Sequence, residues 1–375
     1  MPSACGGRGT VWSPVAAGPI GLVVGVGRAW VEVDLAALWA NYRLLAGRAG
    51  GEVIPVLKAD AYGHGALPLA RFLEGKGVGR FAVATLEEGR RLREGGIKGE
   101  VLLLGSLHPL EAEEALELGL VPTLSTLEAA EALSQRARAL GLVPRAHLKV
   151  DTGMNRVGFP WEEAASALRA VEALGVRVEG VYTHLATAGE DAAFVETQRR
   201  RFQEVRRALG EGYFYHLENS LGLLRHGATA GVRVGLALYG LVPGFGLRPI
   251  LRILARPTLV KRLKAGDRVG YGGVYVARGG EWLATLPVGY ADGLPWGAVR
   301  FVKGPDGRLL EVAGRISMDQ TTVLLPGPVG LEAVFEVLSA DFGPTGLLAW
   351  AEARGTLPYE VAVHLSRRLP RRYLE

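Results

Sequence analysis

Eight short apolar segments recur between residues 53 and 239, and helix-forming stretches separate most of them. Strands that alternate with helices form parallel sheets, because the chain must cross back before the next parallel strand can begin. Eight such units in about 210 residues fit a (β/α)8 barrel better than a doubly wound sheet. We therefore predict a TIM-type barrel with strands at 53–58, 80–85, 101–105, 121–124, 145–150, 176–184, 213–217 and 232–239.

The periodic pattern stops after Gly246, where short strand-like segments joined by Gly, Pro and Asp turns replace it. The expected fold class is therefore α/β in two parts. An N-terminal (β/α)8 barrel occupies 28–245, and a mainly β C-terminal domain with a helical tail from about residue 346 occupies 246–375. Strands of the second domain are expected at 268–275, 281–288, 298–302 and 321–325.

The first 27 residues show neither a helical nor an alternating pattern. Arg8 is their single charge, and no small-residue cleavage site follows the apolar piece at 20–27, which argues against a signal peptide. We expect residues 1–27 to be a disordered extension, or the result of a start site assigned too far upstream. Trp30–Val33 should then form a strand, with Asp34 capping the next helix.

Composition limits the class of protein. The single cysteine, Cys5, excludes an internal disulfide framework and favours the cytoplasm. The longest apolar runs, such as 101–104, are too short to cross a membrane. Arginine supplies 36 of the 43 basic residues, with clusters at 199–201 and 367–372. Without interleaved aromatic residues, both clusters are interpreted as solvated faces and not as nucleic-acid contacts.

Polar residues at the carboxyl ends of barrel strands are the candidates for an active site. Lys58 ends the apolar run 53–57 and precedes a Gly-rich turn. A partly desolvated lysine loses its proton more readily, and the uncharged amine can attack a carbonyl to form a Schiff base. A lysine stem that simply lies along a strand end is the structural alternative. Other candidates at strand ends are Lys149, Arg156, His184, Asn219, Ser220 and Arg233.

One chemistry that these residues suggest is that of a metal-dependent hydrolase. A carbamylated Lys149 and the histidines His64, His184 and His216 would bind zinc. No acidic ligand lies at a helpful spacing, and no histidine belongs to a metal-binding motif. We therefore expect no metal.

The favoured chemistry uses pyridoxal phosphate bound to Lys58. Barrels often bind phosphate with the loops that follow strands seven and eight. Here the hydroxyl of Ser220 and the bare backbone around Gly235 suit a phosphate group.

The motifs in both domains carry a resemblance to bacterial alanine racemases, which are fold-type III pyridoxal phosphate enzymes. It runs from about Trp30 to Tyr373, and the segments come in the family's order. They are VLKADAYGHG at 56–65, HLKVDTGMNRVG at 147–158, GVYTHLATA at 180–188, HLENS at 216–220, VRVGLALYG at 232–240, VGYGGVY at 269–275, LPVGYADG at 286–293, GRISMDQ at 314–320 and TLPYE at 356–360.

The resemblance implies a two-base mechanism in a homodimer with shared active sites. Lys58 matches the Schiff-base lysine and one base. Tyr271 matches the second base, which in this family comes from the partner subunit and acts on the opposite face of the substrate. Arg233 matches the arginine that faces the pyridine nitrogen, and His184 belongs to the same polar chain.

The resemblance also implies roles for the remaining positions. Arg156 matches the arginine that binds the substrate carboxylate, and Lys149 matches a position that is often carbamylated. Glu218 departs from the family pattern and brings a negative charge near the phosphate loop. The implied cofactor contacts are Tyr62, Ser220, Gly235, Leu236 and Tyr359; Met318 is implied on the substrate side, Tyr290 in the access channel, and His216, Asn219 and Asp319 in support.

The expected function is pyridoxal phosphate-dependent racemisation of L-alanine and D-alanine, an isomerase activity that supplies D-alanine for cell-wall peptidoglycan. A racemase of broader specificity, for example one acting on serine, is an alternative on the same scaffold. A pyridoxal phosphate carrier is the alternative outside enzymology, and Tyr271 with its second domain argues against it.

Overall fold

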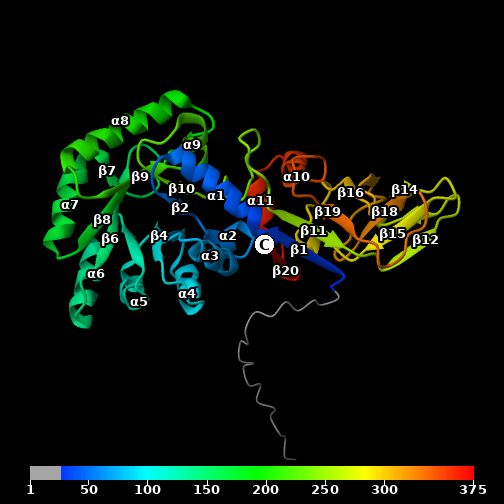
Figure 1. The fold of residues 1–375 in the computed structure, drawn as a ribbon, viewed down its shortest axis with the longest axis horizontal. Helices are drawn as coiled ribbons and strands as arrows, with labels where there is room; N and C mark the ends of the chain where they lie inside the picture. The colour runs from blue at the N-terminus through cyan, green and yellow to red at the C-terminus, as the bar shows by residue number, and fades with distance from the viewer. Residues whose placement is uncertain (1–26) are drawn as a thin grey trace, which may run out of the picture.

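The computed structural model describes residues 27–375, which form two domains lying side by side (Figure 1). The barrel is on the left of that view and the mainly β domain is on the right. The expectation of disorder over 1–27 falls, apart from Gly27, outside the described residues. Within them, every helix is too short or too polar to span a membrane.

Eight parallel strands form the barrel, which confirms the predicted fold class. Hydrogen-bonded neighbours follow the order β2-β10-β9-β8-β6-β5-β4-β3. A parallel bridge between Val56 and Ala82 then joins β2 to β3 and closes the barrel. The strands are β2 (Val53–Pro55), β3 (Arg80–Val83), β4 (Glu100–Ser106), β5 (Val121–Leu124), β6 (Arg145–Asp151), β8 (Arg177–Tyr182), β9 (Phe214–Glu218) and β10 (Gly231–Val234), with the short β7 (Phe159–Pro160) beside β6.

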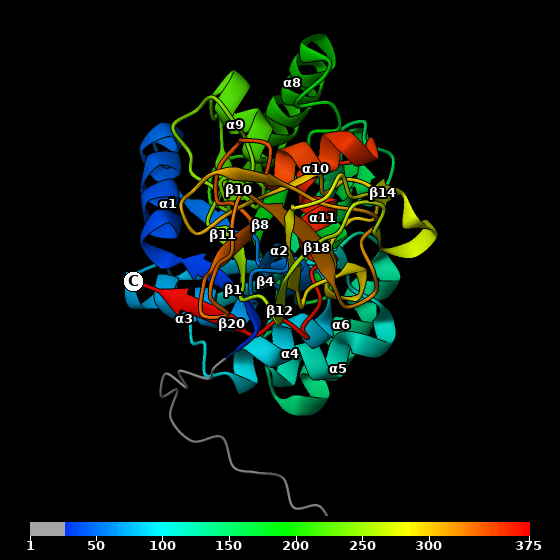
Figure 2. The ribbon, with the colours of Figure 1, turned by 90° about the vertical axis from the view of Figure 1, so that its right-hand side faces the viewer.

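Helices surround these strands, as the view from the second domain shows (Figure 2). Side-chain caps fix where several of them begin. Asp34 accepts a hydrogen bond from the N–H of Ala37 at 2.6 Å, as predicted, and Thr126 and Asp191 cap two later helices in the same way. The helices are α1 (Leu35–Ala49), α3 (Ala66–Gly75), α4 (Leu86–Glu94), α5 (Ala112–Glu117), α6 (Leu127–Leu140), α7 (Ala164–Ala173), α8 (Ala192–Leu209) and α9 (Ser220–His226).

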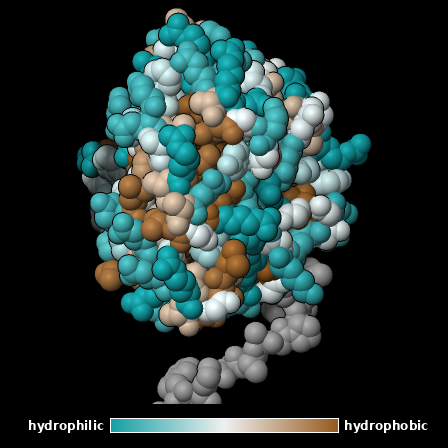
Figure 3. Space-filling model, turned by 90° about the vertical axis from the view of Figure 1, so that its left-hand side faces the viewer, coloured by the Kyte–Doolittle hydropathy of each residue, from teal (hydrophilic) through white to brown (hydrophobic). Residues whose placement is uncertain are grey.

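The side of the barrel domain that points away from the second domain is mostly hydrophilic (Figure 3). Hydrophobic residues appear there mainly in a strip through the middle of the view. Amphipathic helices that bury one side against a barrel leave this kind of surface toward solvent.

The second domain contains a mixed sheet, a smaller antiparallel sheet, a short hairpin and two α-helices. The larger sheet has the order β17-β16-β19-β11-β1-β20, and the smaller has the order β12-β15-β18. The elements are β1 (Ala29–Asp34), β11 (Leu251–Ala255), β12 (Leu259–Arg262), β13 (Arg268–Val269), β14 (Tyr275–Val276), β15 (Trp282–Leu286), β16 (Phe301–Lys303), β17 (Leu309–Glu311), β18 (Thr321–Leu325), β19 (Phe335–Leu338), α10 (Leu347–Arg354), α11 (Pro358–Val363) and β20 (Arg371–Leu374).

The two ends of the described chain meet in the larger sheet. The strand β1, which the sequence places ahead of the barrel, pairs antiparallel with β11 and parallel with β20. The predicted helical tail is present as α10 and α11, but the chain after it ends in β20, which the sequence pattern did not indicate. The barrel and the second domain are therefore joined at both ends of the barrel's sequence.

Ion pairs of alternating sign link the starts of several barrel strands. Arg80 contacts Glu52 at 2.7 Å and Glu100 at 2.5 Å, and Arg145 contacts Glu100 at 3.5 Å and Glu179 at 3.1 Å. The guanidinium of Arg80 also lies 4.6 Å from the centre of the Phe214 ring on β9. These contacts lie at the amino ends of the strands, opposite the carboxyl ends that line the site.

Candidate active site

A cavity of about 710 Å³ lies at the carboxyl ends of the barrel strands and extends to α10 and α11. Eleven of the residues singled out in the sequence line this one cavity, although they come from both domains. They are Lys58, Tyr62, Lys149, Arg156, His184, Asn219, Ser220, Arg233, Gly235, Leu236 and Tyr359.

Lys58 begins a left-handed turn, α2 (Lys58–Tyr62). The strand predicted over 53–58 therefore ends earlier, at Pro55. The four residues Ala59, Asp60, Ala61 and Tyr62 have φ angles between 52° and 54°, a region that costs residues with a Cβ roughly 1–2 kcal/mol each. Such strain persists only where the surroundings impose it, and it concentrates at functional sites. Both ends of this segment, Lys58 and Tyr62, line the cavity.

Contacts from three elements impose this left-handed turn. The carboxylate of Glu88 on α4 accepts the Ala59 N–H at 2.6 Å. Arg371 donates to the carbonyl of Gly63 at 3.1 Å, and a Cβ on Gly63 would lie 2.2 Å from the carbonyl oxygen of Ala362 on α11. The prediction that Arg371 lies on a solvated face is wrong, because its guanidinium donates to backbone carbonyls. Glu88 was also missed, although its place three residues after Thr85 is a capping signal.

Lys58 is half-buried, and its surroundings favour the uncharged amine. Burial lowers the pKa of Lys58, and the charge of Arg156 lowers it further, while Glu88 raises it. An amine that gives up its proton more readily is a better nucleophile toward a carbonyl.

Arg233 occupies the centre of the site and is 3% exposed. Its Nη2 donates to the carbonyl of Thr183 at 2.7 Å and lies 3.1 Å from Nδ1 of His184. Its Nη1 lies 2.7 Å from Nδ1 of His216, which is fully buried behind it. Burial, and next the charge of Arg233, hold the pKa values of His184 and His216 well below their usual range. Both imidazoles are therefore neutral and can accept from the guanidinium.

Lys149 is almost fully buried beside Arg233. Burial, and next the charge of Arg233, lower its pKa to about 7; Asp151 opposes this shift and Arg156 adds to it. Its Nζ donates to the carbonyl of Val150 at 3.3 Å and lies 5.0 Å from the centre of the Tyr182 ring. Near neutral pH this amine is therefore partly unprotonated.

Backbone N–H groups and hydroxyls converge at the end of β10. The predicted strand 232–239 ends at Val234, because the chain turns from Gly235 onward. The hydroxyl of Ser220 accepts from the N–H of Gly235 at 3.3 Å and from that of Ala237 at 3.1 Å. A Cβ on Gly235 would lie 2.5 Å from the Tyr62 hydroxyl, so only glycine leaves room there. Burial raises the pKa of Tyr62 to about 12, which keeps its hydroxyl a proton donor.

Glu218 is fully buried and forms an ion pair with Arg199 beside this loop. Its Oε1 accepts from Arg199 at 3.1 Å and from the hydroxyl of Thr229 at 2.9 Å. Arg199 also donates to the carbonyls of His226 and Gly227. The prediction that Arg199 lies on a solvated face is wrong, because α8 buries it together with Val195, one turn earlier. Because residues four apart share one helix face, the spacing from Val195 could have predicted that Arg199 is buried.

The three histidines considered for zinc do not share a site. His64 binds the carbonyls of Ala61 and Tyr62 and stacks on Tyr239, whereas His184 and His216 contact Arg233. Over residues 27–375, no group of three or more histidine, cysteine, aspartate or glutamate side chains is placed to hold a metal ion.

Four predicted site residues lie outside the cavity, on the second domain of the same chain. Tyr271 is 71% exposed, Met318 is 52% exposed and Tyr290 is 43% exposed. Asp319 contacts Arg368 at 2.7 Å. Within one chain, the lysine side and the tyrosine side of the predicted mechanism are therefore not brought together.

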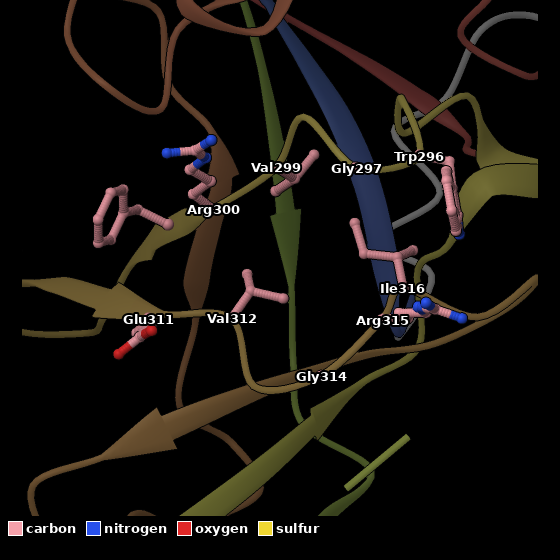
Figure 4. Close-up of a pocket in the computed structure, with 10 residues that line it drawn as sticks. Trp296, Gly297, Val299, Arg300, Glu311, Val312, Gly314, Arg315 and Ile316 are labelled. Atoms are coloured by element: carbon pink, nitrogen blue, oxygen red, sulfur yellow. The ribbon is translucent and has the colours of Figure 1, made fainter. Parts of the chain in front are cut away.

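A second cavity, of about 440 Å³, lies beside the loop that carries Tyr271. Figure 4 shows Trp296 and Arg315 at one end of it and Arg300 and Glu311 at the other. The guanidinium of Arg315 lies 5.9 Å from the centre of the Trp296 ring. A Cβ on Gly272 would come within 3.4 Å of Nη1 of Arg315, so the Tyr271 loop packs on this arginine.

Comparison with known proteins places the chain among relatives that share both domains. The N-terminal domain of alanine racemases matches residues 33–243, and their C-terminal domain matches residues 250–373. The chain belongs to the alanine racemase family. The predicted resemblance is thereby confirmed.

Curated relatives and solved structures agree with this assignment. The alanine racemase of Limosilactobacillus fermentum is 40% identical over 91% of this chain and 96% of its own, and that of Carboxydothermus hydrogenoformans is 38% identical over 92% and 99%. The structure of the Clostridium difficile 630 alanine racemase has a TM-score of 0.86 at 30% identity and covers 93% of this chain and 96% of its own. That of the E. faecalis alanine racemase has a TM-score of 0.85 at 35% identity and covers 94% and 100%.

The buried ion pair of Glu218 and Arg199 predicts how single and double variants change the free energy of unfolding. Glu218→Leu or Arg199→Met alone should destabilise the protein by about 3 kcal/mol, because each leaves a buried charge without its partner. The double variant should cost about 1 kcal/mol or less, since both charges are then gone. Urea unfolding measures all three. Additive losses in the double variant would show that the two side chains do not act as a pair. The exposed pair Arg136–Glu113 provides a control whose removal should cost less than about 0.5 kcal/mol.

Proposed function

We propose that the chain interconverts L-alanine and D-alanine with pyridoxal phosphate bound through Lys58, in a site completed by a second copy of the chain. The observation that carries the proposal is the cavity that joins a lysine of lowered pKa, a buried arginine and the hydroxyls of Tyr62, Ser220 and Tyr359. Membership of the alanine racemase family supports the reaction and the substrate.

The residues of the cavity fit pyridoxal phosphate. The Ser220 oxygen accepts from the N–H groups of Gly235 and Ala237, so its hydroxyl proton can be donated to a phosphate, and Tyr62 also keeps its proton to donate. Tyr359 reaches the same cavity from α11, and its ring centre lies 6.3 Å from that of Tyr62. The bound cofactor would supply an electron sink that makes the Cα proton of an amino acid removable.

Arg233 would face the ring nitrogen of the cofactor. Its guanidinium can donate but not accept, so the nitrogen opposite it would stay unprotonated. A cofactor ring with an unprotonated nitrogen would be a weaker electron sink. The proton would then return promptly to Cα, and side reactions would be disfavoured. The hydrogen bonds to Thr183, His184 and His216 hold the guanidinium in place for this role.

Two bases would act on opposite faces of Cα, as racemisation requires. Lys58 would hold or release the proton on one face, and Tyr271 from the second copy would do so on the other. The exposure of Tyr271 supports this arrangement, because the same domain also exposes Val274, Trp296 and Met318. Apolar side chains exposed on the domain that carries this tyrosine suit a surface that a second subunit covers.

Arg156 would bind the substrate carboxylate, with Lys149 orienting it as a carbamate. The neutral amine of Lys149 would attack carbon dioxide, form the N–C bond and release one proton. The positive charges of Arg233 and Arg156, which disfavour the ammonium form of Lys149, would stabilise the carbamate anion.

D-Alanine made by this reaction would serve cell-wall peptidoglycan, and the chain would act in the cytoplasm. The alanine racemases reported above come from bacteria, which supports both inferences.

Labelling of the lysine tests the proposed function most simply, because the cavity contains two lysines. Borohydride reduction of the pyridoxal phosphate-loaded protein should fix the cofactor on Lys58, whose amine is the more exposed of the two. In heavy water, either enantiomer of alanine should gain deuterium at Cα, and serine should exchange far more slowly. A label on Lys149 would refute the assignment of the lysine. A labelled protein without exchange would indicate a carrier, and equal exchange of serine a broader racemase.

The proposed carbamate predicts a dependence on pH. With a pKa of about 7, Lys149 becomes mostly neutral above that pH and mostly protonated below it. Carbamate formation should therefore rise between about pH 6 and pH 8 and be absent from Lys149→Met. Native mass spectrometry in bicarbonate, or ¹³C NMR with labelled carbon dioxide, measures it. A wild-type signal equal to that of Lys149→Met at pH 8 would refute the modification.

A further inference from the structure

A line of buried hydrogen bonds runs from Arg233 away from the cavity. Nη1 of Arg233 lies 2.7 Å from Nδ1 of His216, and Nε2 of His216 lies 2.9 Å from Nδ1 of His147 on β6. His147 and His216 are both fully buried. His147 does not line the cavity, and the sequence motifs predicted no role for it.

Arg233, the first residue of this line, sets the direction of every hydrogen bond in it. A guanidinium can only donate, so Nδ1 of His216 must accept and its proton must be on Nε2. That proton is then donated to Nδ1 of His147, whose own proton is on Nε2. Both rings are neutral, because burial, and next Arg80 and Arg233, lower the pKa of His147 to about 3, and burial holds the pKa of His216 well below its usual range.

The side chains of His147 and His216 are tightly packed against their neighbours. A Cβ on Gly180 of β8 would lie 2.6 Å from Cε1 of His147, so a glycine is needed beside the ring. His216 is stacked between Tyr182, at 4.4 Å between ring centres, and Phe214, at 5.1 Å. It therefore cannot turn to find another acceptor without disturbing both neighbours.

His147 carries an unsatisfied group, which argues against a purely structural role. Its Nε2 is buried and has no hydrogen-bond partner among the described residues. A leucine at this position would avoid the cost of that unpaired N–H. Its other nitrogen, Nδ1, is the acceptor for His216, and this is what the ring provides.

We propose that His147 is a positioning residue of the racemase site, which fixes the tautomer of His216 and thereby the orientation of Arg233. The inference rests on the proposed function. Without an acceptor at position 147, the proton of His216 can move to Nδ1, where it opposes an N–H of Arg233. The guanidinium then loses His216 as a fixed hydrogen-bond acceptor and is less firmly oriented. The ring nitrogen of the bound cofactor would then be protonated more often. A larger share of alanine should leave as pyruvate, with its amino group retained by the cofactor.

The decisive comparison is between His147→Leu and His147→Asn. Leucine fills the space without an acceptor, whereas the side-chain oxygen of asparagine can take the place of Nδ1. The holoenzymes are assayed for pyruvate released per alanine racemised, with Arg233→Glu as a reference in which the guanidinium itself is absent. We expect this ratio to rise about fivefold in His147→Leu, the effect of one hydrogen bond of ordinary net strength, and to stay within about twofold of wild type in His147→Asn. An unchanged ratio in His147→Leu, or an equal rise in both variants, would overturn the proposal.

A second measurement does not depend on the variants folding or on turnover. ¹⁵N NMR of histidine-labelled wild-type protein should show His147 and His216 both protonated on Nε2 from pH 6 to pH 9. A proton on Nδ1 of either ring, or a charged ring, would overturn the proposal. If the wild type did not racemise alanine, the proposed function would fail while this test still decided the tautomers. If it racemised normally and His147→Leu kept the wild-type ratio, only the role of His147 would fail.

Discussion

The arrangement of the site depends on one buried guanidinium, that of Arg233, which has no carboxylate in contact with it among residues 27–375. Burial lowers the pKa of Arg233 to about 10, so the group is still charged at neutral pH. Its charge is stabilised by the carbonyls of Thr183 and Leu217 and by the neutral rings of His184 and His216. An unpaired buried cation is costly, and it makes the mouth of the barrel attractive to anions. A phosphate and a substrate carboxylate are anions of this kind.

A second constraint is the left-handed turn that follows Lys58. Four consecutive residues with a Cβ adopt a conformation that each would avoid alone. The turn is held by Glu88 from the barrel and by Arg371 from the end of the chain. The pairing of β1 with β20 brings Arg371 to this place. The second domain therefore supports the lysine of its own chain even though its Tyr271 points elsewhere.

The sequence was sufficient for the architecture and for which residues gather, because strand periodicity and motif order are local signals. The eight barrel strands and the residues around Lys58 and Arg233 were predicted on that basis. The left-handed turn was not, since tertiary contacts of Glu88 and Arg371 impose it against local preference. Arg199 and Arg371 were taken for surface charges because burial of an arginine depends on partners far away in the sequence. The same applies to His147, whose partner His216 is 69 residues away.

The proposed mechanism requires Lys58 of one subunit and Tyr271 of the other to act on the same carbon atom. Mixed dimers test it most directly. Chains with Lys58→Ala and chains with Tyr271→Phe, carrying different tags, are co-expressed, and the heterodimer is purified from the two nearly inactive homodimers. One of its two sites then has both groups intact, so it should recover about half of the wild-type racemase activity. A heterodimer as inactive as its parents would contradict the account.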